Sequence, residues 1–259
     1  MKTITSFHFF NVQALSAYRL LVVCVLVGFS PIIKSCDDFT ETSMPVMELN
    51  SNGVFEDLST ATAAMANVYA QIRDNGILTG KTTGISKEMG LYTDELTWYG
   101  NTTQSSANFY FNTLMSTDFT VENWWNNAYS QIYAVNALIE GVENSEKLLV
   151  ADKERLIGQA KFARALVHLY LVQLYGAVPY VTSTDYTVNK NVQRMPEAEV
   201  YDKVIADLES AALLLPSEYT NPNRFLPNSY VAKALLARAY LYAGKWAEAA
   251  NSASAVWIY

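Results

Sequence analysis

Residues 237–249 read Ala-Arg-Ala-Tyr-Leu-Tyr-Ala-Gly-Lys-Trp-Ala-Glu-Ala, and this stretch decides the fold. The small side chains of Ala237 and Ala249 let two helices approach closely, while Tyr240 fills the space between them. Gly244 supplies the turn, because glycine reaches left-handed backbone conformations without a steric penalty. The pattern therefore predicts an antiparallel helical hairpin.

The hairpin pattern extends through most of the chain. It resembles a tetratricopeptide unit, and apolar residues at three- and four-residue steps predict further helices before it. We therefore expect a mostly all-α fold built of tetratricopeptide-like helical hairpins. In the last helix, Trp246, Ala250 and Trp257 form a stripe that we expect to be exposed. The predicted helices cover residues 54–74, 122–142, 150–175, 196–216, 228–243 and 245–259.

One long segment, residues 76–120, breaks the helical periodicity. Its glycines punctuate a Thr-, Ser- and Asn-rich sequence that carries Trp98, Tyr99 and the aromatic run 109–111. We predict a long irregular Gly/aromatic loop excursion with one short helix near residues 86–89. Loops of this length within a compact domain are usually functional.

The composition excludes several classes of function. The 25 acidic and 18 basic side chains give a formal charge of −7, which argues against a nucleic-acid binder. Two Cys and two His are too few for a Cys-rich or multi-histidine metal centre, so we expect no metal site. Aromatic residues make up 13% of the chain, which favours ligand binding by ring stacking over catalysis.

The first 35 residues are expected to be a lipoprotein signal peptide. A weakly basic lead precedes an apolar stretch over residues 20–33, which is too short for a comfortable membrane span. Ser35-Cys36 resembles a bacterial lipoprotein cleavage site, at which Cys36 becomes lipidated, although Lys34 departs from the usual residue there. A plain secretory signal and an uncleaved anchor are the alternatives.

The domain organisation follows from this leader. We expect residues 1–35 to be the signal peptide, residues 36–53 a lipid-anchored tether and residues 54–259 the helical domain. Cleavage leaves 15 basic side chains against 25 acidic ones, a charge of −10, with His168 as the remaining histidine. The pair Asp37-Asp38 resembles the surface-export signal of Bacteroidetes lipoproteins, which implies an outer-membrane anchor facing the cell exterior.

Taken in order, these segments resemble the SusD/RagB family. The resemblance covers nearly the whole mature chain, and the ordered combination is more specific than any single motif. It rests on Thr93-Asp94-Glu95 followed by Trp98, on residues 159–165 and 174–179, on residues 201–208 with 215–216, and on residues 232–241.

The resemblance implies a function. SusD/RagB proteins are surface lipoproteins of Bacteroidetes that capture nutrients, mainly glycans, and deliver them to a SusC-type TonB-dependent transporter. The resemblance therefore implies a non-enzymatic capture protein that needs no cofactor. Family members normally continue well beyond the position of Tyr259, so we expect the chain to be the N-terminal portion of such a protein.

The candidate binding residues lie in the excursion. Sugar binding needs flat apolar platforms beside hydrogen-bond donors and acceptors, and Trp98-Tyr99-Gly100-Asn101 offers both within four residues. By resemblance to glycan-binding members, Trp98 is a stacking platform and Asn101 a polar partner, with Tyr99 beside them. Lys81 is a weaker candidate for a second donor. The alternative is that Trp98 anchors the long loop to the core.

Other conspicuous residues favour structural roles. Asp94-Glu95, with Glu88 nearby, offers the residue types of a glycosidase pair, but adjacent side chains diverge, so we expect no catalysis. His168 lies mid-helix between apolar neighbours and is expected to be packed rather than to act as a base. Trp124-Trp125 at a helix start is expected to serve core and interface packing.

Two other classes of ligand stay open. Peptide capture, as in the RagB branch, is one, and the acidic balance mildly favours cationic ligands. A surface-anchored tetratricopeptide adaptor that binds only protein is the other. Both alternatives include the membrane anchor. They differ from glycan capture in the ligand, which is a peptide or a protein instead of a sugar.

Overall fold

The computed structural model describes residues 51–219 and 222–257 of the chain. Within these ranges the fold is all-α, as predicted, and an isolated β-bridge joins Val178 and Met195. The predicted leader, Cys36 and most of the tether lie outside the described residues. In the described part, no helix has both the length and the hydropathy to cross a membrane. The helices are α2 (Ser51–Val54), α3 (Leu58–Asp74), α4 (Ile85–Tyr92), α5 (Ser105–Tyr110), α6 (Phe119–Asn144), α7 (Val150–Tyr175), α8 (Tyr186–Asn189), α9 (Glu197–Leu214), α10 (Ser229–Tyr242) and α11 (Trp246–Trp257).

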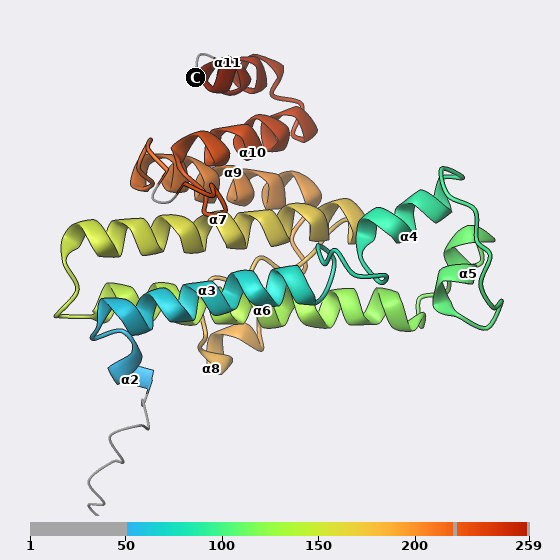
Figure 1. The fold of residues 1–259 in the computed structure, drawn as a ribbon, viewed down its shortest axis with the longest axis horizontal. Helices are drawn as coiled ribbons and strands as arrows, with labels where there is room; N and C mark the ends of the chain where they lie inside the picture. Colours follow the sequence, from blue (N-terminus) through green and yellow to red (C-terminus); the bar gives the residue numbers. More distant parts are fainter. Residues whose placement is uncertain (1–50, 220–221, 258–259) are drawn as a thin grey trace, which may run out of the picture. The chain divides into compact units, whose positions relative to one another are not determined.

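The long helices pack against one another in chain order. α6 lies against α7, α7 against α9, α9 against α10 and α10 against α11, while α3 packs on α6 and α7 (Figure 1). This succession of neighbouring helices is the tetratricopeptide-like arrangement that the sequence predicts. α7 is the central helix, because it contacts α3, α6, α9 and α10.

The last hairpin forms as the opening stretch predicts. Gly244 turns the chain with φ +73°, Ala249 is buried, and the Tyr240 hydroxyl donates a hydrogen bond to Glu209 Oε1 on α9 at 2.5 Å. The outer face of α11 is uncovered: Trp246 is 67% exposed and Trp257 is 91% exposed. The predicted exposure of this stripe is therefore confirmed.

The beginning of the domain differs from the prediction. The sequence favours one helix over residues 54–74, but α2 ends at Val54 and α3 begins at Leu58. The interruption has a local cause, because the Asp57 carboxylate accepts hydrogen bonds from the backbone N–H groups of Ser59 and Thr60 and caps α3. At the other end, α3 stops at Asp74, as predicted, and Gly76 has φ +77°.

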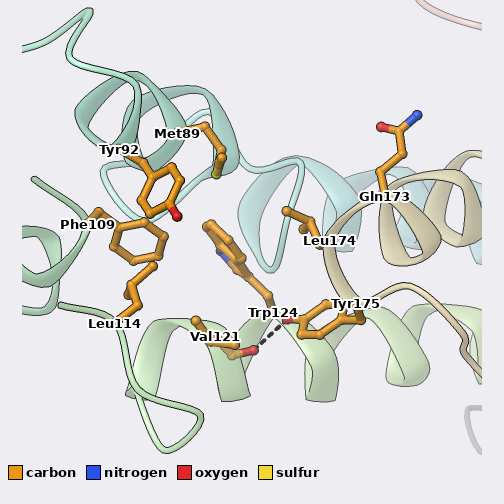
Figure 2. Close-up of a pocket in the computed structure, with 9 residues that line it drawn as sticks. All are labelled: Met89, Tyr92, Phe109, Leu114, Val121, Trp124, Gln173, Leu174 and Tyr175. Carbon is orange, nitrogen blue, oxygen red and sulfur yellow. Dashed lines mark hydrogen bonds between the residues drawn. The ribbon is translucent and has the colours of Figure 1, made fainter. Parts of the chain in front are cut away.

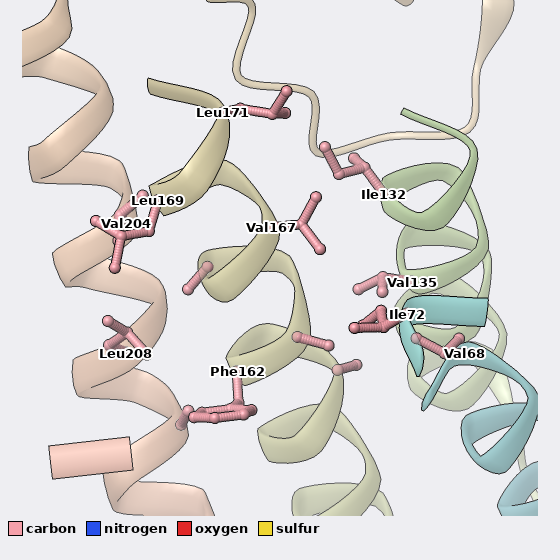
Figure 3. Packing of buried hydrophobic residues seen from close by; sticks show 14 of the residues in the cluster. Val68, Ile72, Ile132, Val135, Phe162, Val167, Leu169, Leu171, Val204 and Leu208 are labelled. Carbon is pink, nitrogen blue, oxygen red and sulfur yellow. The ribbon is translucent and has the colours of Figure 1, made fainter. Parts of the chain in front are cut away.

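The apolar core runs along both sides of α7. Leu169 and Val204 pack together between α7 and α9, whereas Val167 faces Ile132 and Val135 of α6 (Figure 3). Burying such side chains contributes about 1.5–3 kcal/mol each. A helix that is apolar on opposite faces is typical of a buried position, which explains why α7 lacks a single amphipathic stripe.

A polar cluster crosses this core. The Arg164 guanidinium on α7 donates from Nε and Nη2 to both carboxylate oxygens of Asp207 on α9, at 2.7 and 2.8 Å. Its Nη1 donates to Asn136 Oδ1 on α6 at 2.8 Å. Tyr180, in the segment after α7, donates its hydroxyl to Asp207 Oδ2 at 2.6 Å. One buried ion pair therefore joins α6, α7, α9 and the exit of α7.

We predict that Arg164→Met destabilises the fold strongly. Removing the guanidinium leaves Asp207 as a buried, uncompensated carboxylate, and breaking a buried pair in this way costs about 3–5 kcal/mol. The free energy of unfolding, measured by urea denaturation, reports the loss. Arg73→Met is the matched control, because Arg73 pairs with Asp74 at the surface and its side chain is 74% exposed. Equal effects of the two substitutions would contradict this account.

His168 is packed beside the cluster, as predicted. It is fully buried on α7, its ring stacks on Tyr180 with a centroid distance of 4.0 Å, and Nδ1 lies 2.9 Å from the Arg164 carbonyl oxygen. Burial lowers the pKa of His168 from 6.5 to about 4, because charging the ring inside the core is unfavourable. The imidazole is therefore neutral at neutral pH and contributes packing.

This lowered pKa predicts a pH dependence of stability. The unfolded chain takes up a proton at His168 near pH 6.5, whereas the folded chain takes it up only near pH 4. Stability contributed by the neutral ring is thus complete above pH 6.5 and falls as the pH is lowered to 4, by roughly 3 kcal/mol at most. Urea denaturation at several pH values tests this. In His168→Phe this component of the slope should vanish; an unchanged slope would contradict the assignment.

Candidate ligand-binding site

The excursion between α3 and α6 is more ordered than predicted. α4 is longer than the short helix expected near residues 86–89, and α5 has no counterpart among the predicted helices. α5 depends on a distant residue, because the buried Asp118 carboxylate accepts hydrogen bonds from Ser105 Oγ at 2.5 Å and Asn108 Nδ2 at 3.0 Å. Asp118 also caps α6 by accepting from the Thr120 N–H at 2.9 Å.

The lowered pKa of Asp118 keeps its carboxylate charged, as these hydrogen bonds require. Burial alone would raise the pKa of Asp118, but the hydrogen bonds from Ser105, Asn108 and the backbone of α6 outweigh burial, and the pKa is lowered. The carboxylate therefore joins α5 to the first turn of α6. The spacing of apolar residues in the sequence does not predict this contact.

Trp98 lies in a short turn after α4 and is held on several sides. Its ring is half-buried and packs on the edge of the apolar core. The indole Nε1–H donates to the Asn101 carbonyl oxygen at 3.3 Å, and Lys87 Nζ lies 4.9 Å from the ring centroid. Gly100 packs directly on the indole, because a Cβ there would lie 2.2 Å from Cζ2. Trp98 is thus both a loop anchor and a partly accessible ring.

The other candidate residues occupy different settings. Tyr99 is 90% exposed and Asn101 is exposed on the same turn as Trp98. Asn101 Oδ1 accepts hydrogen bonds from the Thr103 N–H at 2.9 Å and the Thr103 hydroxyl at 3.0 Å, which stiffens the turn. Lys81 lies near the start of the excursion, with Nζ 3.8 Å from Asp74 Oδ1. The structure therefore groups three of the four candidates in one turn and places Lys81 in a separate ion pair.

An apolar pocket of about 260 Å³, missed by the sequence analysis, lies where the excursion meets α6 and α7. Figure 2 shows the Trp124 indole at its centre, between residues of α4 and α5 on one side and the end of α7 on the other. The Trp124 Nε1–H donates to the Thr83 carbonyl oxygen at 2.7 Å. The Tyr175 hydroxyl donates to the Val121 carbonyl oxygen at 2.7 Å. The lining residues are Met89, Tyr92, Phe109, Leu114, Val121, Trp124, Gln173, Leu174 and Tyr175.

The two adjacent tryptophans of α6 serve packing, as expected. Trp124 is buried and its ring lies 5.6 Å from that of Phe109. Trp125 is half-buried and packs against Tyr129 and Tyr175. The pocket beside Trp124 has few polar groups, and Figure 2 shows the Gln173 amide directed away from it. Its lining suits apolar groups better than hydroxyl-rich ones.

The candidate carboxylates have unlike surroundings. Asp94 and Glu95 are exposed, and Asp94 takes a left-handed backbone conformation with φ 63°. Glu88 is fully buried and pairs with Lys87, Nζ to Oε1, at 3.1 Å. A glycosidase needs two carboxyl groups that flank one bond, whereas among the described residues Glu88 is buried in an ion pair and Asp94 and Glu95 lie at the surface. In that part of the chain, no group of three or more His, Cys, Asp or Glu is placed to hold a metal ion.

The chain matches the SusD-like family described as "Starch-binding associating with outer membrane" over residues 65–241. The chain belongs to this family. It is 35% identical to SusD-like protein P2 of Formosa agariphila over 142 residues, which cover 52% of this chain and 27% of that protein. It is 22% identical to SusD-like protein P25 of the same organism over 236 residues, which cover 89% of this chain and 44% of that protein. In both cases the match spans less than half of the relative.

Solved structures share the fold. A SusD-like protein of Bacteroides fragilis superposes with a TM-score of 0.65 at 20% identity, over 79% of this chain and 38% of that chain. A structure described as a laminarin-binding SusD-like protein superposes with a TM-score of 0.67 at 23% identity, over 76% and 43% of the two chains. The helical, tetratricopeptide-like architecture is thus the fold of the family.

We predict that Gly100→Ala loosens the Trp98 turn. The added methyl group would fall on the indole, so the ring must leave its present position. Trp98 should then be oxidised faster by N-bromosuccinimide, as measured by peptide mass spectrometry. Gly80→Ala is the control, because a Cβ at Gly80 would meet no atom within 4 Å and the residue does not have positive φ. An unchanged oxidation rate at Trp98 in Gly100→Ala would refute the packing argument.

Proposed function

We propose that this protein is a non-catalytic capture protein that binds a glycan through the turn 98–101. The observation that carries the proposal is the pairing of two rings with the side-chain amide of Asn101 on this turn: Trp98 is half-buried, Tyr99 is 90% exposed and Asn101 is exposed beside them. Rings stack on the C–H faces of sugars, while amide groups bond their hydroxyls. Membership of the SusD-like family and the laminarin binding of a structural neighbour support a glycan as ligand.

The proposal includes the cellular setting. Cys36 is the lipid attachment site, residues 1–35 are its signal peptide and residues 36–53 its tether, so the domain 54–259 is held at the outer membrane and faces the cell exterior. The family description, "associating with outer membrane", supports this setting. The lipid, rather than a helix of the domain, makes the membrane contact.

A SusC-type TonB-dependent transporter is the proposed partner. Several large apolar side chains of the excursion are between 45% and 73% exposed. Contact of such side chains with water is unfavourable, and clusters of them mark interaction sites. Such a surface suits a protein partner. The side chains are Leu96, Phe111, Met115 and Phe119.

A protein-binding adaptor is the second candidate function. A groove of about 440 Å³ between α10 and α11 has a mostly apolar lining that includes Leu241 and Trp246. A groove of this kind suits an amphipathic helix. Peptide capture, as in the RagB branch, would use the same exposed surfaces with a different ligand.

Affinity electrophoresis in laminarin and in a panel of other soluble glycans tests the proposal. We expect the mobility of the full chain to be retarded by at least one glycan, and Trp98→Ala to weaken the interaction about tenfold by removing the stacking platform. Tyr186→Ala is the matched control, because Tyr186 is a 76% exposed aromatic residue on α8, outside the excursion. The glycan should release no reducing sugar during incubation.

The outcomes separate the candidates. Retardation of wild type and Trp98→Ala alike would refute the assignment of the turn. Retardation by none of the glycans would refute glycan capture and favour the adaptor or the peptide-binding function. Release of reducing sugar would contradict a non-catalytic protein.

A further inference from the structure

Lys87, Glu88 and Ser106 form a partly buried cluster beside the Trp98 ring. Lys87 Nζ donates hydrogen bonds to Glu88 Oε1 at 3.1 Å and to Ser106 Oγ at 2.5 Å. The Ser106 hydroxyl donates in turn to Glu88 Oε1 at 2.8 Å. The three groups close a triangle that joins α4 to α5, and neither Lys87 nor Ser106 stands out in the sequence.

Burial makes this cluster hard to rearrange. The Glu88 side chain is only 1% exposed, and its Oε2 has no hydrogen-bond partner among the described residues. A carboxylate in this position depends on the ammonium group for charge compensation, because an unpaired buried charge is very unfavourable. Lys87 is therefore held in place by Glu88 rather than free to move in solvent, although its side chain is 28% exposed.

The fixed ammonium group faces the proposed platform. Lys87 Nζ lies over the Trp98 ring at 4.9 Å from the centroid, within the range of a cation–π contact. We propose that Lys87 is a positioning residue for the ligand site: the buried triangle holds its ammonium group, and the ammonium group holds the Trp98 indole in one orientation. This inference rests on the proposed function, in which Trp98 is the stacking platform.

Such positioning has a physical benefit for binding. A ring that is already fixed loses little conformational freedom when a ligand stacks on it, so more of the contact energy appears as affinity. Gly100 and the Asn101 carbonyl group constrain the same indole from within its own turn. Lys87 adds the contact from outside the turn and connects the platform to α4 and α5.

The test separates positioning from folding. Lys87→Met alone would leave the Glu88 carboxylate buried without a charged partner and could destabilise the fold. The variant used is therefore Lys87→Met/Glu88→Gln, which replaces both charged side chains by neutral ones of similar size. Lys203→Met is the control, because Lys203 is exposed on α9. The indole N–H signals of the five tryptophans are recorded by ¹⁵N–¹H NMR, and Trp98 is assigned by the absence of its signal in Trp98→Phe.

We expect the Trp98 signal to shift or broaden in the double variant while the other four indole signals stay in place. Laminarin, or whichever glycan of the panel binds wild type, should bind the double variant about tenfold more weakly. An unmoved Trp98 signal, or unchanged affinity despite a moved signal, would overturn the proposal. If wild type binds no glycan, the proposed function fails, and the NMR result still decides whether Lys87 orients the ring.

Discussion

The ion pair between Arg164 and Asp207 is the interaction on which the rest of the structure depends. A bidentate guanidinium–carboxylate contact requires a defined geometry, so this pair specifies the register of α7 against α9. Arg164 of this pair also donates a hydrogen bond to Asn136 on α6, and Asp207 accepts one from Tyr180 after the end of α7. Four segments therefore share one set of hydrogen bonds. Burial raises the pKa of Tyr180 well above 10, so its hydroxyl stays a neutral donor to Asp207.

The excursion depends on this scaffold because it is attached at the ends of the helices that the ion pair aligns. Gln131 on α6 donates to the carbonyl oxygens of Gln71 and Asn75 at the end of α3, where the excursion begins. Near its other end, Tyr175 at the end of α7 donates to Val121 on α6. A shift of α7 relative to α6 would therefore move the lining of the pocket.

The sequence predicts well those parts of the fold whose cause is local. α7 has the predicted limits of 150–175, and the turn at Gly244 needs only the conformational freedom of glycine. α5 escapes prediction because its partner, Asp118, is 13 residues from Ser105 in the chain. The site divides in the same way: the residue types of the turn 98–101 indicate a binding role, but Lys87 is distant from Trp98 in sequence and has no motif of its own.

The excursion also shows why polar contacts hold this site. It is rich in Gly, Ser, Thr and Asn, whose side chains offer little apolar surface for packing. Two buried carboxylates supply polar contacts instead. Asp118 accepts hydrogen bonds that join α5 to the start of α6, and Glu88 accepts hydrogen bonds from Lys87 and Ser106. Tyr99 and Asn101 are exposed on the turn, and Asn101 also holds the turn together through its hydrogen bonds with Thr103 and the Trp98 indole. Substitution of Tyr99 therefore leaves these polar contacts in place, whereas substitution of Asn101 removes the side-chain hydrogen bonds with Thr103.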